Sequence, residues 1–566
     1  MKIRIRGDDE TCTAARPQFA EHDVEIESDR ETAVDLELVA SADSDTLRAA
    51  NSDAIAESRP VVLVELGGIG GRAIDGVEGG LIVASPAGPC YQCLERRVEA
   101  IHTDAPTIED RPSPSVRRIL GAVAGWVAFH AEQPPYGGRL IEFPWTERTV
   151  HPVPDCPACD GNGRWTAPSE TPASSRSLDE AIAAVETVID EHVGIVKQIG
   201  EADSEPLPYY LAQLADTAAF SAVTAPQQAA GVAEDWNRAL MKGVGEALER
   251  YAAGIYRESD FRMASIDTLE DAIHPARFVR PSDWETIDEP LPWVPGTSLR
   301  ESEHRWVPAE VVVFPPPRRD IRPAITTGLA LGNTPEEARA AGLAEVIERD
   351  ATMLAWYSTY EPVGVRVDDD RFDRLVRHAE LEGLSVSTTL VTQDVDVPVI
   401  AAAVHREGDF PRFALGSAAG LDPVDTAIDA LREAIQNWME LAAMGPEGAA
   451  AEAPRITDYG SDPGAAREFM SPETILDATS LGSQSTDGDS SLDNLVERTV
   501  QAGMEPIAVT TTTRDLDSLG FHATRILVPT AQPLFTGSAY FGERAKRIPT
   551  ELGFEPRLDR DPHPFP

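Results

Sequence analysis

The sequence predicts an α/β (α+β) protein with mixed sheets, in which strands and helices alternate along most of the chain. Short β-rich runs at residues 61–66 and 81–84 are separated by glycine-rich turns. From residue 178 onward, helical periods of 3.6 residues alternate with β-rich runs such as VVVF at 311–314 and GVRV at 364–367. A related loop–helix segment recurs three times. Because 42% of the 566 residues are hydrophobic, the chain can bury several cores, and we expect two or three domains.

Residues 1–163 are predicted to form a small α/β domain with a structural zinc site. Four of the five cysteines form two Cys-x-x-Cys pairs, Cys90 with Cys93 and Cys156 with Cys159, and 62 residues separate the pairs. Four thiolates in this pattern match a closed tetrahedral zinc site, which leaves no position for a substrate. An iron–sulfur cluster uses the same ligands and is the alternative. We favour zinc because no redox motif accompanies the cysteines.

The next segments predict a linker and a second, larger domain. Residues 164–177 are rich in Pro, Ser and Thr, which is typical of a linker. A long helical pattern then begins at Leu178 and continues to about residue 196. Residues 445–492 are rich in Gly, Ala, Ser and Asp with little apolar period, so we expect a flexible insertion there. The predicted boundaries are therefore 1–163, 164–177 and 178–566.

The recurring segments are residues 229–251, 329–350 and 418–438. Each contains a glycine in a loop, then the start of a helix, then an alanine-rich helix with a glutamate: Glu246, Glu345 or Glu433. We expect such units to pack around a common centre. The third segment ends EAIQNW, so it keeps the glutamate but replaces the rest of the pattern that the other two share.

The first two helices carry an ExxER motif on one face. At 100° per residue, the polar stripe consists of Lys242, Glu246, Glu249 and Arg250 in the first helix, and of Glu337, Glu345, Glu348 and Arg349 in the second. Facing carboxylates repel each other unless a cation lies between them. Oxygen ligands suit Mg²⁺, which also binds phosphates. In so acidic a chain, a single ExxER motif could be only a solvent-exposed helix face with ion pairs. Two such motifs in related segments favour a metal-bridged nucleotide site instead.

These motifs resemble those of the YcaO family, whose ATP site combines an SxxxExxER helix with an NxxxE…ExxER segment. The second element is complete here from Asn333 to Arg349, and the first has Lys242 in place of serine. The resemblance covers about 178–566 and implies a YcaO-type fold with repeated loop–helix units. It implies Mg²⁺ binding by Glu246, Glu249, Glu345 and Glu348, and ATP contacts from Lys242, Arg250, Asn333, Glu337 and Arg349.

The last five residues, PHPFP, resemble the PxPxP terminus of the azoline-forming members of that family. This implies ATP-dependent cyclodehydration of Cys, Ser or Thr in a ribosomal precursor peptide to thiazoline or oxazoline, as in bacteriocin biosynthesis. Catalytic roles are implied for Pro562, Pro564 and Pro566. Two alternatives stay open: backbone thioamidation with a sulfur-delivery partner, and a non-catalytic docking scaffold.

The segment GPCYQCL at residues 88–94 resembles the zinc knuckle in the later half of the ubiquitin-activating-enzyme-like fold. That family's glycine-rich ATP loop is absent from residues 1–60, so the resemblance implies a shortened, non-catalytic scaffold. There is no obvious room for a peptide clamp, and a separate leader-binding protein is therefore expected.

The charge of the chain excludes some partners. The net charge is −46, from 95 acidic and 49 basic residues, and only four of the basic residues are lysines. Such a surface suits a halophilic cytoplasm, where salt screens the repulsion, and it offers no basic stripe for nucleic acid. No apolar stretch approaches the ~20 residues of a membrane span, and the start of the chain lacks an apolar signal segment. We therefore expect a cytoplasmic protein. As a separate expectation, it acts as a homodimer.

Overall fold

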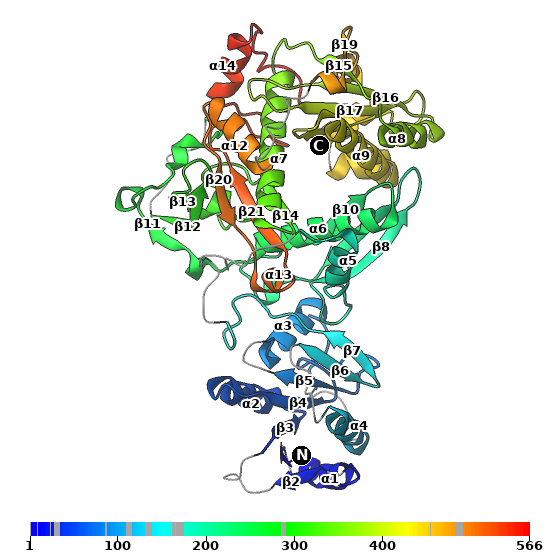
Figure 1. Ribbon diagram of the computed structural model, residues 1–566, viewed down its shortest axis with the longest axis vertical. Helices are drawn as coiled ribbons and strands as arrows, with labels where there is room; N and C mark the ends of the chain where they lie inside the picture. The colour runs from blue at the N-terminus through cyan, green and yellow to red at the C-terminus, as the bar shows by residue number, and fades with distance from the viewer. Residues whose placement is uncertain are drawn as a thin grey trace.

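The computed structural model describes residues 2–7, 9–22, 24–27, 34–84, 88–108, 116–130, 138–160, 165, 175–282, 284, 290–452, 454–481 and 491–566. Figure 1 shows two parts stacked along the long axis, with the N-terminal strands and helices at one end and the larger remainder at the other. Within the described ranges, no helix is long and apolar enough to cross a membrane.

The N-terminal part is built on a seven-stranded sheet of order β2-β1-β3-β4-β5-β6-β7. The first four strands are parallel to their neighbours, and the last three continue the sheet in antiparallel fashion. The strands are β1 (Lys2–Arg6), β2 (Glu25–Glu27), β3 (Leu36–Ser41), β4 (Val61–Leu66), β5 (Gly79–Ala84), β6 (Arg139–Phe143) and β7 (Thr146–Thr149). The runs expected at 61–66 and 81–84 are thus confirmed as strands.

Helices cover both faces of this sheet. They are α1 (Asp9–Ala20), α2 (Ser44–Ala56), α3 (Tyr91–Ile101) and α4 (Val116–Phe129). Val62 and Val64 of β4 pack with residues of α1 and α4, whereas Val61 and Leu63 pack with residues of α2 and α3. Successive side chains of a strand point to opposite faces, so a strand that is buried on both faces is hydrophobic throughout.

The larger part contains three sheets. One has the order β11-β12-β20-β21-β14 with β13 paired to β12, the second β18-β17-β16-β15-β19, and the third β10-β9-β8. The strands are β8 (Val196–Asp203), β9 (Tyr209–Leu214), β10 (Gln228–Val232), β11 (Arg262–Ala264), β12 (Leu291–Ser298), β13 (His304–Pro308), β14 (Leu329–Gly332), β15 (Val363–Arg366), β16 (Ser385–Leu390), β17 (Val399–His405), β18 (Phe413–Ala419), β19 (Ile475–Asp477), β20 (Ile507–Thr510) and β21 (His522–Leu527).

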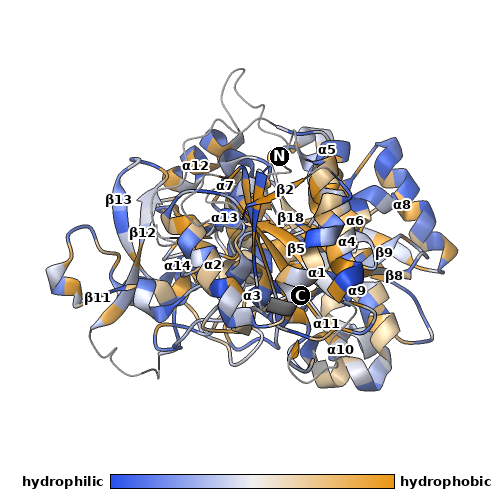
Figure 2. Cartoon of the chain, turned by 90° about the horizontal axis from the view of Figure 1, so that it is seen from below, coloured by the Kyte–Doolittle hydropathy of each residue, from blue (hydrophilic) through white to orange (hydrophobic). Residues whose placement is uncertain are grey.

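The helices of this part are α5 (Leu178–Glu186), α6 (Trp236–Gly254), α7 (Pro335–Trp356), α8 (Asp370–Leu381), α9 (Pro423–Glu452), α10 (Pro454–Ser461), α11 (Gly464–Phe469), α12 (Ser491–Gln501), α13 (Arg514–Ser518) and α14 (Glu543–Glu551). Figure 2 shows hydrophobic strands at the centre and hydrophilic residues gathered on outer helices such as α8. Helix α8 turns Phe372, Leu375 and Ala379 inward, which is the pattern of a surface helix.

The three recurring segments form strand–loop–helix units: β10 with α6, β14 with α7, and β18 with α9. Polar side chains cap the first two helices, since Asp235 accepts from the N–H of Arg238 and Thr334 from the N–H of Glu337. Glycine permits close strand–helix packing. A Cβ at Gly231 would lie 2.1 Å from a backbone nitrogen of α6.

Three local expectations were wrong. The helix expected from Leu178 to about residue 196 ends at Glu186, because Asp190 accepts two backbone N–H groups in a turn and β8 then begins. The VVVF run is not a strand, because a 3₁₀ helix (Ala309–Val311) ends at its first residue and three prolines at 315–317 follow it. The GVRV run is part of β15, as expected.

The third wrong expectation was the flexible insertion at residues 445–492. This segment contains α10, α11 and β19, and β19 pairs with β15 in parallel. Ala466 and Phe469 supply the buried face that the weak apolar period had hidden. Residues 482–490 lie outside the described ranges, as do residue 164 and residues 166–174 of the expected linker.

Candidate active site

The three repeat helices bind the segment before them through the same glutamate, within β10 and β18 and one residue before β14. The carboxylate of each accepts a hydrogen bond from a backbone N–H: Glu246 from Ala230 (2.8 Å), Glu345 from Gly328 (2.8 Å) and Glu433 from Ser417 (2.7 Å). The contact fixes each helix in the same position relative to its strand. The third unit therefore keeps the geometry of the other two although it lacks the complete motif.

Burial and mutual repulsion raise the pKa values of the second glutamate in each ExxER motif, Glu249 and Glu348. Burial, and after it the charges of Glu345 and Glu246, raises the pKa of Glu249 to about 8. Burial also raises the pKa of Glu348 to about 8, with Glu433 adding to the effect and Arg349 opposing it. These carboxyl groups hold protons near pH 7 unless a cation replaces them.

Arg349 connects the second motif to the third repeat. Its side chain is 13% exposed, and its guanidinium lies 3.3 Å from Glu348 and 3.7 Å from Glu433. The hydroxyl of Ser417 donates to Glu348 at 2.6 Å. The sequence offered no role for the third repeat, but the structure brings Glu433 and Ser417 into the cluster.

The C-terminal tail reaches the same cluster. Arg349 donates to the backbone oxygen of Pro566 at 3.2 Å. Residues 563–565, which include Pro564, are buried. The hydroxyl of Tyr459 donates to the carbonyl oxygen of Pro562 at 2.5 Å, and the ring of His563 pairs with a backbone oxygen at 2.7 Å. The three predicted prolines therefore belong to a docked segment that ends beside the ExxER motif.

The other predicted nucleotide contacts lie on or beside the same two helices. Arg250 pairs with Glu246 and donates to a backbone carbonyl of β10 at 2.6 Å. Glu337 accepts from the backbone N–H of Asn333 at 3.0 Å. The buried side-chain oxygen of Asn333 has no hydrogen-bond partner among the described residues, so it is an acceptor that a ligand could satisfy. Lys242 is exposed.

This donor set fits Mg²⁺ together with a polyphosphate. Buried like charges with raised pKa values favour a divalent cation, and carboxylate oxygens are its preferred ligands. Within the described part of the chain, only the four cysteines bring three or more ligand atoms to within 4.8 Å of one another. The wider spacing of the glutamates suits Mg²⁺ ions that keep water and share phosphate oxygens, rather than one ion enclosed by protein.

The cysteine tetrad is assembled for a metal. The Sγ of Cys90 lies 3.8 Å from that of Cys93 and 3.7 Å from that of Cys156, and Cys93 lies 3.5 Å from Cys159. A tetrahedral zinc ion with Zn–S bonds of about 2.3 Å places its sulfurs about 3.8 Å apart. A multi-iron cluster holds its thiolates farther apart because the cluster lies between them. The spacing therefore fits zinc.

The tetrad lies where the two parts of the chain meet. Its cysteines share one hydrophobic core with Val244, Leu248 and Tyr251 of α6. Arg514, at the start of α13, donates to the Sγ of Cys159 at 3.4 Å. The metal site therefore belongs to the same core as the helix that carries the first ExxER motif.

A buried ion pair, not predicted from the sequence, strengthens this junction. Arg97 of α3 donates to Asp515 of α13 at 2.5 Å, and the hydroxyl of Tyr251 on α6 donates to the same carboxylate at 2.6 Å. The side chains of Arg97 and Asp515 are 1% and 0% exposed. The partners are 418 residues apart in sequence, so no local pattern could have indicated the pair.

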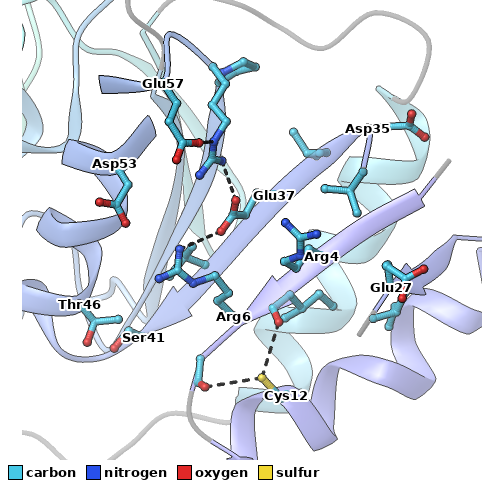
Figure 3. A pocket seen from close by; sticks show the side chains of 18 of the residues that line it. Arg4, Arg6, Cys12, Glu27, Asp35, Glu37, Ser41, Thr46, Asp53 and Glu57 are labelled. Atoms are coloured by element: carbon cyan, nitrogen blue, oxygen red, sulfur yellow. Dashed lines mark hydrogen bonds and ion pairs between the residues drawn. The ribbon is translucent and has the colours of Figure 1, made fainter. Parts of the chain in front are cut away.

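A polar cavity of about 1260 Å³ in the N-terminal part is a second place to consider. Figure 3 shows Arg6 directed toward Glu37, and Cys12 toward two backbone oxygens. Glu37 pairs with Arg6 at 2.9 Å and with Arg59 at 2.6 Å. Because these charges satisfy one another, we take the repeat cluster as the candidate active site.

Two ExxER faces, a third repeat and a docked proline-rich tail are the features of a metal- and nucleotide-dependent enzyme. The family model of the YcaO cyclodehydratases, described as ATP- and Mg²⁺-binding, matches residues 230–532, more than half of the chain. The chain belongs to this family and is an ATP-dependent cyclodehydratase of the YcaO type. The predicted family and the α/β fold class are thus confirmed.

Relatives extend the comparison. An uncharacterized protein of Methanothermobacter thermautotrophicus is 29% identical over 314 residues, which are 53% of this chain and 80% of that protein. A heterocyclase solved in complex with substrate and cofactor is 20% identical, with a TM-score of 0.78, and the match covers 100% of this chain and 85% of that one. YcaO from Methanopyrus kandleri bound with AMPPCP and Mg²⁺ is 24% identical, with a TM-score of 0.51, over 63% of this chain and 91% of that one. Both structures share the fold of this chain.

Proposed function

We propose that this enzyme converts Cys, Ser or Thr of a ribosomal precursor peptide to thiazoline or oxazoline, as in bacteriocin biosynthesis, with ATP and Mg²⁺. The observation that carries the proposal is the docked PHPFP tail, whose last backbone oxygen lies 3.2 Å from Arg349 of the ExxER motif. A tail in this place supports ring formation rather than backbone thioamidation, the alternative that would need a sulfur-delivery partner.

The reaction exchanges an amide oxygen for a ring bond. The side-chain thiol or hydroxyl of the peptide adds to the preceding amide carbon and loses its proton. The amide oxygen then attacks the γ-phosphorus of ATP, and the bond to ADP breaks. Phosphate next leaves carbon as the nitrogen loses its proton and the C=N bond forms. Mg²⁺, when bound, would neutralise charge on the phosphates.

The residues of the chain take distinct parts in this scheme. The proposed Mg²⁺ ligands are Glu246, Glu249, Glu345 and Glu348, and the proposed nucleotide contacts are Lys242, Arg250, Asn333, Glu337 and Arg349. Arginine and lysine offset phosphate charge. The tail from Pro562 to Pro566 excludes water from the phosphoryl group and the tetrahedral centre.

The remaining expectations complete the proposal. Residues 1–163 form a shortened, non-catalytic scaffold with structural zinc at the tetrad, and residues 178–566 form the catalytic domain. A separate protein captures the leader of the peptide. The enzyme acts as a homodimer in a salt-rich cytoplasm. The YcaO of Methanopyrus kandleri was solved with AMPPCP and Mg²⁺ bound, which supports ATP and Mg²⁺ as the cofactors here.

The test measures ATP turnover in high salt with Mg²⁺, with and without peptides encoded by neighbouring genes. Glu345→Gln removes one proposed ligand, and we expect ADP release to fall by about 10- to 100-fold or more. Glu380→Gln on the exposed face of α8 is the matched control and should leave turnover unchanged. Mass spectrometry follows loss of water from the peptide.

Each outcome separates the alternatives. Peptide-stimulated ADP release with loss of water, both abolished by Glu345→Gln, supports the cyclodehydratase. ADP release with exchange of oxygen for sulfur, only when a sulfur donor is added, would assign thioamidation. No nucleotide binding by the wild-type protein would leave the docking scaffold.

A further inference from the structure

The first and third repeats share a second contact. In each, a helix side chain donates to a backbone carbonyl, which belongs to the residue two positions before the one whose N–H the glutamate binds. In the first unit, Arg250 donates to the carbonyl oxygen of Gln228 at 2.6 Å. In the third, Asn437 donates to that of Leu415 at 2.8 Å. Arg250 and Asn437 stand at the same position, four residues after the glutamate. In both units the last residue of the motif is therefore bound to its own strand.

The second unit departs from this pattern. The equivalent carbonyl is that of Thr326, two residues before Gly328, and Arg349 does not bind it. Arg525 of β21 donates to the oxygen of Thr326 at 2.6 Å and to that of Ile325 at 2.8 Å. Its side chain is buried, with a relative exposure of 2% for the residue. An arginine from a distant strand thus donates the hydrogen bond that a helix residue donates in the other two units.

The strand register explains why only this unit has such a substitute. Each repeat strand pairs with an antiparallel neighbour. In each strand we compare the residue that follows the one whose N–H the glutamate binds. Its partner on the neighbouring strand is Tyr210 for Gly231, Arg525 for Leu329 and Ile400 for Ala418. Neither tyrosine nor isoleucine can donate two hydrogen bonds to carbonyl oxygens as a guanidinium does.

The consequence for Arg349 is a different orientation. Its guanidinium lies 3.3 Å from Glu348 and 3.7 Å from Glu433, and it donates to the backbone oxygen of Pro566 at 3.2 Å. Arg250, which has no such substitute, pairs only with the glutamate of its own motif among the described carboxylates. Arg349 is therefore the motif arginine that faces both the metal ligands and the tail.

We propose that Arg525 is a positioning residue for Arg349: it occupies the carbonyl of Thr326 and so leaves Arg349 free to join the glutamates of the second and third repeats to the C-terminal tail. The proposal rests on the proposed function, because Arg349 then acts on the phosphate of ATP. Without Arg525, Arg349 turns back to its own strand as Arg250 does.

The test is a double-mutant cycle on ATP turnover. Arg525→Met removes the donors and keeps an apolar stem, and we expect kcat/KM for ATP to fall by about 10- to 100-fold, the range for groups that orient ligands. Arg349→Met should lower kcat/KM for ATP by at least the same factor. The double variant should be no worse than Arg349→Met alone, because Arg525 acts through Arg349. Additive losses, or full activity of Arg525→Met, would overturn the proposal.

The matched control is Arg406→Met. Arg406 also donates to two backbone carbonyls, those of Glu382 and Phe410, and none of these three residues is part of the cluster. We expect its replacement to change kcat/KM less than twofold. If Arg525→Met fails to fold, Arg525→Lys takes its place in the same cycle. A lysine cannot hold both carbonyls in the planar fork of a guanidinium, and a smaller loss, again absent in the Arg349→Met background, is expected.

A crystal structure of Arg525→Met without nucleotide separates this proposal from the proposed function. Arg349 bound to the oxygen of Thr326 supports the positioning role, even if the wild-type enzyme turns over no ATP under the conditions tried. Arg349 still bound to Pro566 refutes it, whatever the activity.

Discussion

Replacing Asp515 by asparagine should destabilise the junction between the two parts of the chain more than any surface change. The substitution keeps the shape and the acceptor for Tyr251 but leaves the guanidinium of Arg97 without its counter-charge. At 2.5 Å and an effective dielectric constant of about 20, the Coulomb attraction between the two is roughly 7 kcal/mol before desolvation. Breaking a buried pair on one side typically costs about 3–5 kcal/mol.

We expect the lower end of that range for Asp515→Asn. Arg97 keeps its hydrogen bonds to the carbonyl oxygens of His151 at 3.3 Å and Pro152 at 2.9 Å, which partly solvate the charge. The assay is urea denaturation at constant high salt, followed by tryptophan fluorescence. Because Tyr251 is on α6, the apparent KM for ATP should also rise.

Two further variants make the reasoning testable. Asp477→Asn breaks the exposed pair with Arg366, whose side chains are 61% and 66% exposed, and should cost less than about 1 kcal/mol. The double variant Arg97→Met, Asp515→Leu removes both buried charges. It should recover part of the unfolding free energy that Asp515→Asn loses. If Asp515→Asn and Asp477→Asn lower the free energy of unfolding by the same amount, the argument from burial is refuted.

Three other predictions concern the metal, the tail and the salt. Cys156→Ser should abolish zinc binding, measured by elemental analysis, and lower the melting temperature, because the tetrad shares a core with α6; an unchanged melting temperature would contradict this. Burial lowers the pKa of His563 from 6.5 to about 4, so the docked tail should be fully stable above pH 6.5 and lose stability as the pH falls toward 4. Carboxypeptidase should then digest the tail faster at low pH. In His563→Gln, the rate of digestion should not depend on this titration. Lowering KCl from about 1 M to 0.1 M lengthens the screening distance from about 3 to 10 Å, so a chain of net charge −46 should melt earlier; a constant melting temperature argues against a halophilic protein.

The sequence predicted those parts of the site that lie within one helix. The stripes of α6 and α7 follow from the helical period alone, and the two helices contain all the residues of the expected stripes, Lys242 to Arg250 and Glu337 to Arg349. Similarity among the three segments also predicted equivalent loop–helix units. The repeated hydrogen bond between glutamate and strand confirms that geometry.

Contacts between distant segments could not be predicted in this way. Arg525 comes from a strand 199 residues after Thr326, and only the register of β14 with β21 brings the two together. Asp515 of α13 likewise reaches Arg97 of α3 across 418 residues, through the packing of the two parts of the chain. Composition also misled at 445–492, because α11 buries only Ala466 and Phe469 and a six-residue helix is too short to show a clear period.

The third repeat has a consequence for the history of the chain. Gln436 and Asn437 stand where the other copies have Glu and Arg, yet Glu433 makes the same bond to its strand as Glu246 and Glu345 do. The bond therefore serves architecture in all three units, and only the first two helices carry a second glutamate three residues later, Glu249 or Glu348. Duplication of one ancestral unit, followed by specialisation, leaves such a pattern. The third helix still packs in a hydrophobic core, and its Glu433 still lies 3.7 Å from Arg349 of the second unit.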